Sequence, residues 1–318
     1  MAVAVIESLR TFLDIARGLR RFLGEPAPAG PAEDDPQSAE LLRRAQAAQV
    51  TGRRDEAAAY YRQILQNRRA HLAALRGLRD VSVEAGQWRE ALEVQERVVD
   101  LVVVTERAHE AEWLAVIHHA LGRQELERGN RAGAIGHFKS AVRADRHFVP
   151  AAVALGDAYE AAGDHREAVR TWERAAEAEP VLALLGRLER AYREEGRPSR
   201  MIALYRGALE RAPEDLSLAV ALGRVYFELE MLDEAADQFE KVEVQAPDAP
   251  AVHAFLGAVF ERRGERWEAF EEYRRALRLG HAFDWPHRCT ACAAAAPLWQ
   301  ERCPRCGRWN TLRAAPGR

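Results

Sequence analysis

Residues 155–180 read LGDAYEAAGDHREAVRTWERAAEAEP, and three positions in this stretch say most about the fold. Gly156 has no side chain, so one helix can pass close to another there. Gly163 suits a tight turn, because glycine adopts a positive φ at little cost. Pro180 cannot continue a helix. The stretch therefore predicts two short helices that are joined by a tight turn and end near residue 180.

The same pattern recurs along most of the chain. Its turn positions are Gly52, Gly86, Gly129, Gly163, Gly196, Glu230 and Gly264, and the successive spacings are 34, 43, 34, 33, 34 and 34 residues. Some copies depart from the pattern. Ala45 and Arg79 stand in the first two copies where Gly156 stands in the fourth, and Glu230 replaces a turn glycine. Seven copies at this period indicate a repeat protein.

These copies resemble the tetratricopeptide repeat, a helix–turn–helix unit of 34 residues. A single repeat cannot bury its apolar face, so neighbouring repeats must stack. We therefore predict an all-α fold, a superhelix of about seven repeats over residues 38–281. Extra residues between the second and third copies fall in Leu101–Ala111, with Thr105 as a candidate N-cap. They form either a longer helix or loop, or a bend in the array.

The first helices of the repeats are expected to line a concave groove. The charged residues assigned to this groove as partner-binding candidates are Arg76, Arg123, Asp157, Arg190, Arg193, Arg224 and Arg262. Two interpretations stay open at this point. The arginines could bind an acidic peptide segment, since guanidinium groups pair well with carboxylates. They could equally be ordinary solvated helix charges, which are common and contribute little.

All four cysteines lie near the C-terminus, as two C-x2-C pairs: Cys289 with Cys292, and Cys303 with Cys306. This spacing puts two thiolates on each of two tight turns, which together complete a tetrahedral metal site. Redox motifs or free thiols are alternatives, but no βαβ pattern surrounds the pairs. We predict a rubredoxin-like ribbon over residues 282–313, followed by a tail, 314–318. Zinc is favoured, and iron fits the same ligands.

The charge balance bears on possible partners. Lys and Arg number 46 against 49 Asp and Glu, a formal net charge of −3, which argues against nucleic acid as the partner of the whole chain. The ribbon is locally basic, with Arg288, Arg302, Arg305 and Arg308 around the cysteines. These arginines offset the negative charge of four thiolates and a dication. Binding of RNA or DNA by the ribbon is the alternative.

The repeats and the ribbon together resemble the lipopolysaccharide assembly protein B family. The order Cys289, Cys292, Leu298-Trp299, Cys303-Pro304, Cys306, Trp309 follows the metal-binding tail of that family. The resemblance covers roughly residues 38–313. It implies an adaptor at the cytoplasmic face of the inner membrane, which promotes degradation of the lipid A deacetylase by a membrane-bound AAA protease. It also implies that the ribbon docks on the repeats.

The N-terminus departs from that family, whose members begin with a transmembrane helix. Residues 1–24 are interrupted by charges and cannot span a membrane, but they can form an amphipathic helix. Such a helix could attach to the membrane surface, dock on the first repeat or self-associate. A start codon further upstream is another possibility. Residues 25–37 are rich in proline and acidic residues and read as a linker.

We therefore expect a non-enzymatic adaptor that is cytoplasmic or peripheral on the inner membrane. A cytosolic repeat scaffold with other protein partners and no lipopolysaccharide role is the alternative. The sequence has no phosphate-binding glycine loop, and its ten histidines are scattered. A closed shell of four thiolates would leave no open position for a substrate, which argues against catalysis at the metal.

Overall fold

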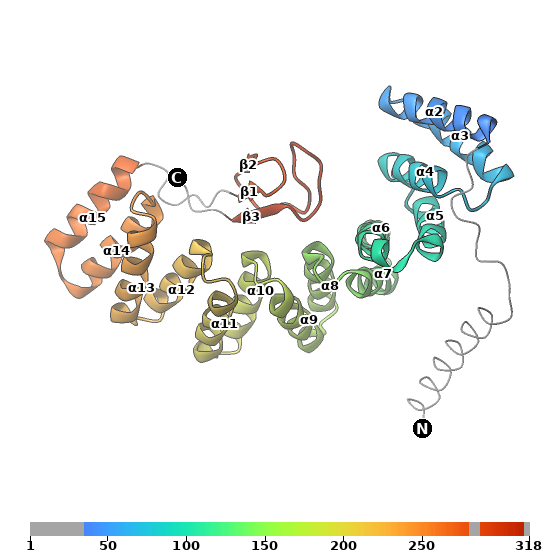
Figure 1. Cartoon of the computed structure of the whole chain (residues 1–318). Coiled ribbons are helices and arrows are strands. Elements are labelled where there is room, and N and C mark those ends of the chain that lie inside the picture. The colour runs from blue at the N-terminus through green and yellow to red at the C-terminus, as the bar shows by residue number, and fades with distance from the viewer. Residues whose placement is uncertain (1–34, 280–286, 315–318) are drawn as a thin grey trace. The chain divides into compact units, whose positions relative to one another are not determined.

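The computed structural model describes residues 35–279 and 287–314 (Figure 1). The predicted N-terminal helix, 1–24, and the tail from residue 315 lie outside these residues. The described chain is largely helical and ends in a small three-stranded sheet. The helices are α2 Pro36–Val50, α3 Arg54–Asn67, α4 Leu72–Glu84, α5 Trp88–Leu101, α6 Arg107–Glu127, α7 Arg131–Ala144, α8 Val149–Ala161, α9 His165–Ala178, α10 Leu182–Glu194, α11 Pro198–Arg211, α12 Leu216–Glu228, α13 Leu232–Gln245, α14 Pro250–Arg263 and α15 Arg266–Leu279.

The described residues divide into two compact units, one that ends at Val81 and one that begins at Ser82. The division falls within α4. The first unit contains α2, α3 and most of α4. The helix α2 begins at Pro36, within the segment 25–37 that we assigned to the linker. It begins there because the Asp35 side chain accepts a hydrogen bond from the Ser38 N–H, 2.9 Å long, and because proline is well tolerated in the first turn of a helix.

The second unit contains the remaining helices and the ribbon. Its helices pack as neighbours in chain order, with α6 against α7, α8 against α9, α12 against α13, and α14 against α15. Each tight turn between paired helices has the predicted positive φ. This includes Glu230, at φ 59°, which adopts the conformation although it is not glycine. The paired-helix architecture predicted from the period is therefore confirmed.

Close approach of two helices explains the glycine at position 156. A β-carbon added to Gly156 would lie 2.0 Å from Nε1 of Trp172, which is fully buried on α9. Repeat five solves the same packing problem with polar groups. Glu189 stands at the equivalent position, and its carboxylate accepts a 2.6 Å hydrogen bond from the Tyr205 hydroxyl. The same position in the repeat is therefore filled by glycine against a tryptophan ring in one repeat and by a hydrogen-bonded glutamate in the next.

The extra residues before the third repeat form a 3₁₀ turn, Val104–Glu106, and lengthen α6 to 21 residues. Our assignment of Thr105 as an N-cap is wrong. Thr105 lies within the 3₁₀ turn, and Glu106 occupies the N-cap position of α6 without a capping hydrogen bond from its side chain. The turn carries the chain directly into the helix, so no cap is placed at Thr105.

The ribbon is built on an antiparallel sheet in the order β2-β1-β3. Its strands are β1 His287–Cys289, β2 Ala295–Ala296 and β3 Leu312–Ala314. His287 pairs with Ala296 on one side and with Ala314 on the other. An isolated bridge joins Arg302 to Trp309 across the second cysteine turn. The sheet is short, so the cysteine turns between its strands make up much of this domain.

Candidate metal centre and partner surfaces

The four cysteine sulfurs lie together in the ribbon. The Sγ atoms of Cys289 and Cys306 are 3.7 Å apart, and those of Cys292 and Cys303 are 3.8 Å apart. All four sulfurs lie within 4.8 Å of one another. A tetrahedron with zinc–sulfur bonds of about 2.3 Å has sulfur–sulfur edges of about 3.8 Å. The described cysteines are therefore spaced as ligands of one tetrahedral ion, and this distance is too long for a disulfide.

The backbone turns behind both cysteine pairs adopt positive φ. Gly307, directly after the second pair, has φ 69°, and Ala293, after the first pair, has φ 55°. Both turns direct amide groups toward sulfur, as in the 3.4 Å hydrogen bond from the Ala291 N–H to Cys289 Sγ. Alanine thus replaces glycine at the first turn without changing its conformation.

Hydrogen bonding prepares part of this cluster for the thiolate form. The Cys289 thiol donates a 3.2 Å hydrogen bond to the Thr311 hydroxyl oxygen, and the interaction with Thr311 is the main cause that lowers the pKa of Cys289 to about 6. The backbone N–H of Cys306 lowers the pKa of Cys303. The Ala294 N–H acts in the same direction on Cys292. There, however, burial and hydrogen bonds with the other three sulfurs outweigh it and raise the pKa to about 11. Four crowded sulfurs cannot all ionise unless a cation is bound.

The ribbon contacts the repeats through Glu301. Its Oε2 accepts a 3.0 Å hydrogen bond from Arg123 on α6, and its Oε1 lies 3.4 Å from Nε2 of the fully buried His119. Burial would raise the pKa of Glu301, but the interactions with His119 and Arg123 outweigh burial and lower it. Arg123, a predicted groove residue, therefore holds the ribbon.

Aromatic packing extends this interface. The ring of Trp309 lies 5.8 Å from that of His119 and 6.4 Å from that of Phe148, centroid to centroid. The Asn310 side-chain amide donates to the His147 carbonyl oxygen at 3.1 Å. The resemblance implied that the ribbon docks on the repeats. The structure has such contacts, with α6 and with the loop before α8. Figure 1 shows the sheet beside these repeats.

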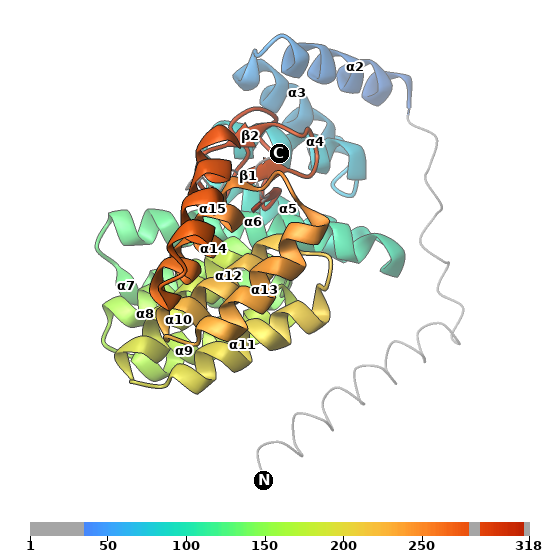
Figure 2. The ribbon, with the colours of Figure 1, turned by 90° about the vertical axis from the view of Figure 1, so that its left-hand side faces the viewer.

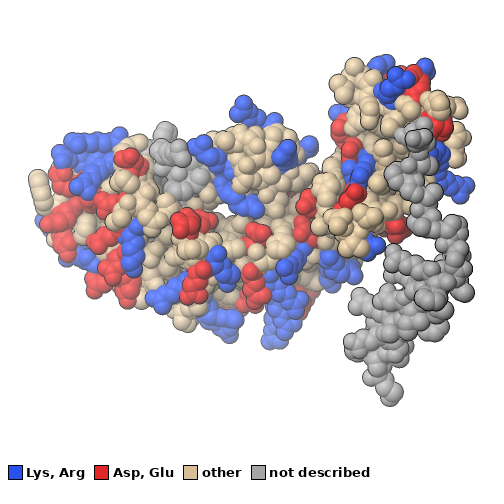
Figure 3. Space-filling view, viewed as in Figure 1, with Lys and Arg blue, Asp and Glu red and all other residues tan. Residues whose placement is uncertain are grey.

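The other predicted groove residues of the second unit lie in ion pairs between neighbouring repeats. Asp157 on α8 receives two hydrogen bonds from Arg187 on α10, and Arg190 pairs with Glu160 at 2.9 Å. Arg262 on α14 pairs with Glu230. Acidic and basic side chains accordingly lie interspersed along the repeats in Figure 3. Arg76 lies half-buried on α4, in the first unit.

A denser network surrounds Glu189. Arg224 on α12 donates to both Glu189 oxygens, at 3.0 and 2.5 Å, and Arg193 donates to Glu189 and Glu228. Burial would raise the pKa of Glu189, but the hydrogen bonds from Arg224 and Tyr205 lower it. Two of the predicted binding residues, Arg193 and Arg224, are therefore part of the bracing between α10 and α12.

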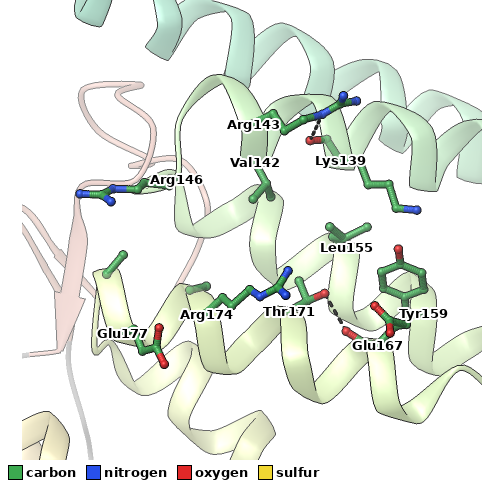
Figure 4. A pocket seen from close by; sticks show the side chains of 12 residues that line it. Lys139, Val142, Arg143, Arg146, Leu155, Tyr159, Glu167, Thr171, Arg174 and Glu177 are labelled. Atoms are coloured by element: carbon green, nitrogen blue, oxygen red, sulfur yellow. Dashed lines mark hydrogen bonds between the residues drawn. The ribbon is translucent and has the colours of Figure 1, made fainter. Parts of the chain in front are cut away.

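A cleft of about 650 Å³ opens between α7, α8 and α9, and sequence reasoning did not find it (Figure 4). Its apolar lining includes Val142, Leu155 and Ala175. Its rim carries four cations, Lys139, Arg143, Arg146 and Arg174, and two carboxylates, Glu167 and Glu177. Three of the cations come from the end of α7 and the loop after it, which the sequence analysis did not assign to a binding surface.

The cations at this rim differ in their partners from the arginines on the first helices of the repeats. Lys139 Nζ lies 5.3 Å from the centre of the Tyr159 ring, and Arg143 donates to the Lys139 carbonyl oxygen and the Ser140 hydroxyl. Within residues 35–279 and 287–314, neither Lys139 nor Arg174 forms an ion pair with a carboxylate. The arrangement can therefore accept an anionic group from outside.

A second cluster of titratable groups, Glu243, His253 and Glu272, lies between α13, α14 and α15. His253 Nδ1 is 2.7 Å from Glu272, and its Nε2 is 2.7 Å from the Pro247 carbonyl oxygen. Arg275 also donates to Glu272, at 2.8 Å. Both ring nitrogens of His253 face oxygen atoms of the protein, so this cluster joins the three helices.

Comparison with known proteins agrees with both parts of the chain. A family model described as "Rubredoxin metal binding domain" matches residues 287–314, and models of the tetratricopeptide repeat match residues 119–183, 153–216 and 192–259. Residues 119–259 are therefore tetratricopeptide repeats, and residues 287–314 form a rubredoxin-type domain. The predicted fold class, an all-α repeat array with a small four-cysteine domain, is confirmed.

The resemblance to lipopolysaccharide assembly protein B is also confirmed. The Escherichia coli K12 and O157:H7 proteins of that name are each 24% identical to this chain over 281 residues, which is 84% of this chain and 69% of theirs. Among solved structures, one titled "Crystal structure of MamA" is 22% identical with a TM-score of 0.39, and covers 50% of this chain and 94% of its own. The repeat protein YrrB is 20% identical with a TM-score of 0.38, and covers 56% and 93%. Within residues 35–279 and 287–314, none of the helices combines the length and the hydrophobicity that a membrane-spanning segment needs.

Proposed function

We propose that this protein is a non-enzymatic adaptor whose repeats bind an acidic segment of a partner protein in the cleft between α7, α8 and α9. The observation that carries this proposal is the combination of an apolar floor with Lys139 and Arg174, which form no ion pair among the described residues. A segment with carboxylates beside one apolar side chain matches both features.

The first-helix arginines fit this role less well. Arg190, Arg193 and Arg262 already have carboxylate neighbours, so a partner carboxylate would replace one ion pair by another. Exposed pairs of this kind contribute roughly 0–1 kcal/mol. Exchange therefore gains little, whereas pairing a cation at the cleft adds a new interaction.

In this proposal the ribbon binds one zinc ion through Cys289, Cys292, Cys303 and Cys306. Iron is the alternative for the same thiolates. The ion would be structural, because four protein ligands complete its coordination. Its role is to hold the turn that presents Glu301 and Trp309 to the repeats.

The relatives suggest which partners to test. By resemblance to lipopolysaccharide assembly protein B, we propose that the partners are the lipid A deacetylase and a membrane AAA protease. The adaptor would then work at the cytoplasmic face of the inner membrane and bring the first to the second. A cytosolic scaffold with other partners is the alternative.

The experiment measures binding of the purified, metal-loaded full chain to the deacetylase and to the protease in detergent by calorimetry. The test variant is Arg143→Glu with Arg174→Glu, which reverses charge on both walls of the cleft. The matched control is Arg166→Glu, an exposed residue of α9 outside the lining. We expect the double variant to weaken binding at least tenfold and the control to leave it unchanged.

Two outcomes would contradict the proposal. If the double variant binds as tightly as the native chain, the partner binds outside the cleft. No binding of either candidate partner by the folded, metal-loaded chain would remove the lipopolysaccharide role and favour the scaffold.

A further inference from the structure

The loop between α7 and α8, residues 145–148, lies between the cleft and the ribbon. It carries Arg146, which belongs to the rim of the cleft, and His147, whose carbonyl oxygen contacts the ribbon. In Figures 1 and 2 the ribbon lies above α8 and α9. Figure 4 shows Arg146 at one edge of the cleft, on the side where the ribbon is drawn. This short loop therefore connects the ribbon with the proposed partner site.

Arg146 is held by its neighbour in the loop. Its Nε–H donates to Nε2 of His147 at 3.0 Å, and Nδ1 of the same imidazole lies 3.1 Å from Oε1 of Glu179, the C-cap residue of α9. A guanidinium group is always a donor, so Nε2 accepts and the ring proton is on Nδ1, directed at the carboxylate. One imidazole therefore ties Arg146 to α9, the helix that supplies Arg174 to the same rim.

Asn310 of the ribbon also holds His147. Its side-chain amide donates to the His147 carbonyl oxygen at 3.1 Å, and that oxygen accepts a second bond, 2.9 Å long, from the Val149 N–H at the start of α8. Among the described residues this is the one hydrogen bond of the Asn310 side chain, and its Oδ1 is buried without a partner. The side chain therefore serves contact with the loop rather than the fold of the ribbon.

The backbone at Asn310 supports this interpretation. Asn310 has φ 53°, in the left-handed region that favours glycine, and Gly307 nearby has φ 69°. Among residues that carry a side chain, asparagine is one of those that tolerate this region best. Backbone conformation alone would thus favour glycine at position 310. Asparagine accepts the conformation and adds an amide that reaches the loop.

Apolar packing fixes the loop next to this hydrogen bond. The buried ring of Phe148 lies in a cluster against which Trp309 of the ribbon and Val142 of α7 pack. Val142 also belongs to the apolar lining of the cleft. The ribbon thus contacts the loop at a polar position, His147, and at an apolar one, Phe148.

We propose that the docked ribbon positions one wall of the cleft, with Asn310 and His147 as the positioning residues. This inference rests on the proposed function, because the cleft is the site proposed there for an acidic segment. A loop that is already ordered loses little conformational freedom when a partner binds, so the docked ribbon strengthens binding without touching the partner. Coupling of this kind is reciprocal, so a bound segment also strengthens docking of the ribbon.

The first experiment needs no partner. It measures hydrogen exchange of residues 145–149 in the metal-loaded full chain and in Asn310→Gly, a change that keeps the positive φ and removes the amide. We expect exchange in the loop to become about fivefold faster, as for the loss of one hydrogen bond, with the metal retained. The matched control is Ala293→Gly, which places glycine at another positive-φ position of the ribbon, φ 55°, and should leave the loop unchanged.

The second experiment measures partner binding by calorimetry, with the deacetylase and the protease as in the test of the proposed function. Asn310→Gly should weaken binding about fivefold, and Arg146→Ala should weaken it too. In a double-mutant cycle the two losses should not add, because both act through the position of Arg146. The bound partner should in turn slow hydrogen exchange at residues 308–314 of the ribbon.

Three results would overturn this inference: unchanged exchange at residues 145–149 in Asn310→Gly, equal acceleration in Ala293→Gly, or additive losses in the cycle. They are distinct from failure of the proposed function. If Arg143→Glu with Arg174→Glu weakens binding while Asn310→Gly changes neither exchange nor affinity, the cleft binds the partner and the ribbon does not position it. If neither partner binds the cleft, the proposed function fails, and exchange in the loop alone decides whether the ribbon fixes it.

Discussion

The ribbon and the repeats of this protein are stabilised in different ways. The buried centre of the ribbon consists of Cys289, Ala296, Cys303 and Leu312, so cysteines supply half of its buried residues. The repeats of the second unit instead share one continuous apolar cluster that runs from α7 to α14. A domain with so small a buried centre depends on a few bonds, whereas a repeat array distributes its stability over many contacts.

The two regions meet at an interface that combines both kinds of stabilisation. Trp299 packs against the ribbon centre and also against the repeat cluster. Glu301 supplies the charged contact to α6. Loss of the ribbon should therefore affect its docking surface but leave most of the repeat core in place. Substitutions in the ribbon, in the repeats and at the contact between them can test whether the two regions are stabilised in these different ways.

The largest effect is expected from Cys303→Ser with Cys306→Ser. Metal binding supplies on the order of 10–16 kcal/mol to domains of this type, and the ribbon has no apolar core that could compensate. The variant should lose its metal, measured by elemental analysis, and the amides of residues 287–314 should lose protection in hydrogen exchange. The helices should keep their far-ultraviolet dichroism. Collapse of the repeats together with the ribbon would contradict this separation.

Gly156→Leu tests the packing of the repeats. The new side chain begins 2.0 Å from the Trp172 ring, so α8 and α9 must move apart. Overpacking of this kind should lower the free energy of unfolding by about 3 kcal/mol, measured by urea denaturation. The control is Gly136→Ala on α7, where nothing lies within 4 Å of the added carbon. It should stabilise the chain by about 0.5–1 kcal/mol, and equal effects of the two changes would contradict the packing role of Gly156.

Glu301→Gln tests the contact between the two regions. It removes the charge that Arg123 and His119 face, and charge-assisted hydrogen bonds contribute about 1.5–3 kcal/mol. Part of this interaction is exposed to solvent, so we expect a loss of about 1 kcal/mol in docking, seen as faster hydrogen exchange at residues 308–314 with the metal retained. Glu195→Gln removes an exposed partner of Arg197 and should change nothing measurable. Unchanged exchange in Glu301→Gln would show that the contacts of Trp299, Trp309 and Asn310 hold the ribbon without the Glu301 charge.

The smallest effect concerns pH and lies within the repeats. Burial, together with the positive potential of His137 and Arg143, lowers the pKa of His118 to about 4, so the folded chain resists protonation there. The unfolded chain binds that proton near pH 6.5, and stability is therefore lost as the pH falls from 6.5 toward 4. Because His118 is only half-buried, solvent screening reduces the loss to roughly 1 kcal/mol. His118→Gln should show a smaller decrease in melting temperature between pH 7 and pH 5, and parallel decreases would contradict this role.

Much of the repeat fold could be predicted from single residues. The period, the turn glycines and Gly156 reflect local backbone conformation and close helix contact, both of which the sequence expresses directly. Glu189 could not be interpreted in this way. Its role depends on Tyr205, 16 residues away, and on Arg224, 35 residues away, and spacing alone does not predict that such groups meet.

The residues of the candidate sites also fall into those that the sequence predicts and those that it does not. The cysteine pairs predicted a shared centre because each C-x2-C turn places two sulfurs side by side. The groove arginines were identified by register, but register does not report their partners, and Asp157, Arg190 and Arg262 lie in ion pairs between repeats. The cleft was missed because its cations come from α7, α9 and the loop after α7, and share no motif.

The repeat unit and the four-sulfur cluster are thus determined by the sequence alone. The repeat period, the turn glycines and the C-x2-C spacing all depend on residues that are close along the chain. Folding of the whole unit decides which charges are already paired, which face of α6 receives Trp309, and which apolar side chains of α15 remain uncovered. Those outcomes depend on residues that are distant in sequence and brought together by packing, and on whether a neighbouring repeat covers the last helix.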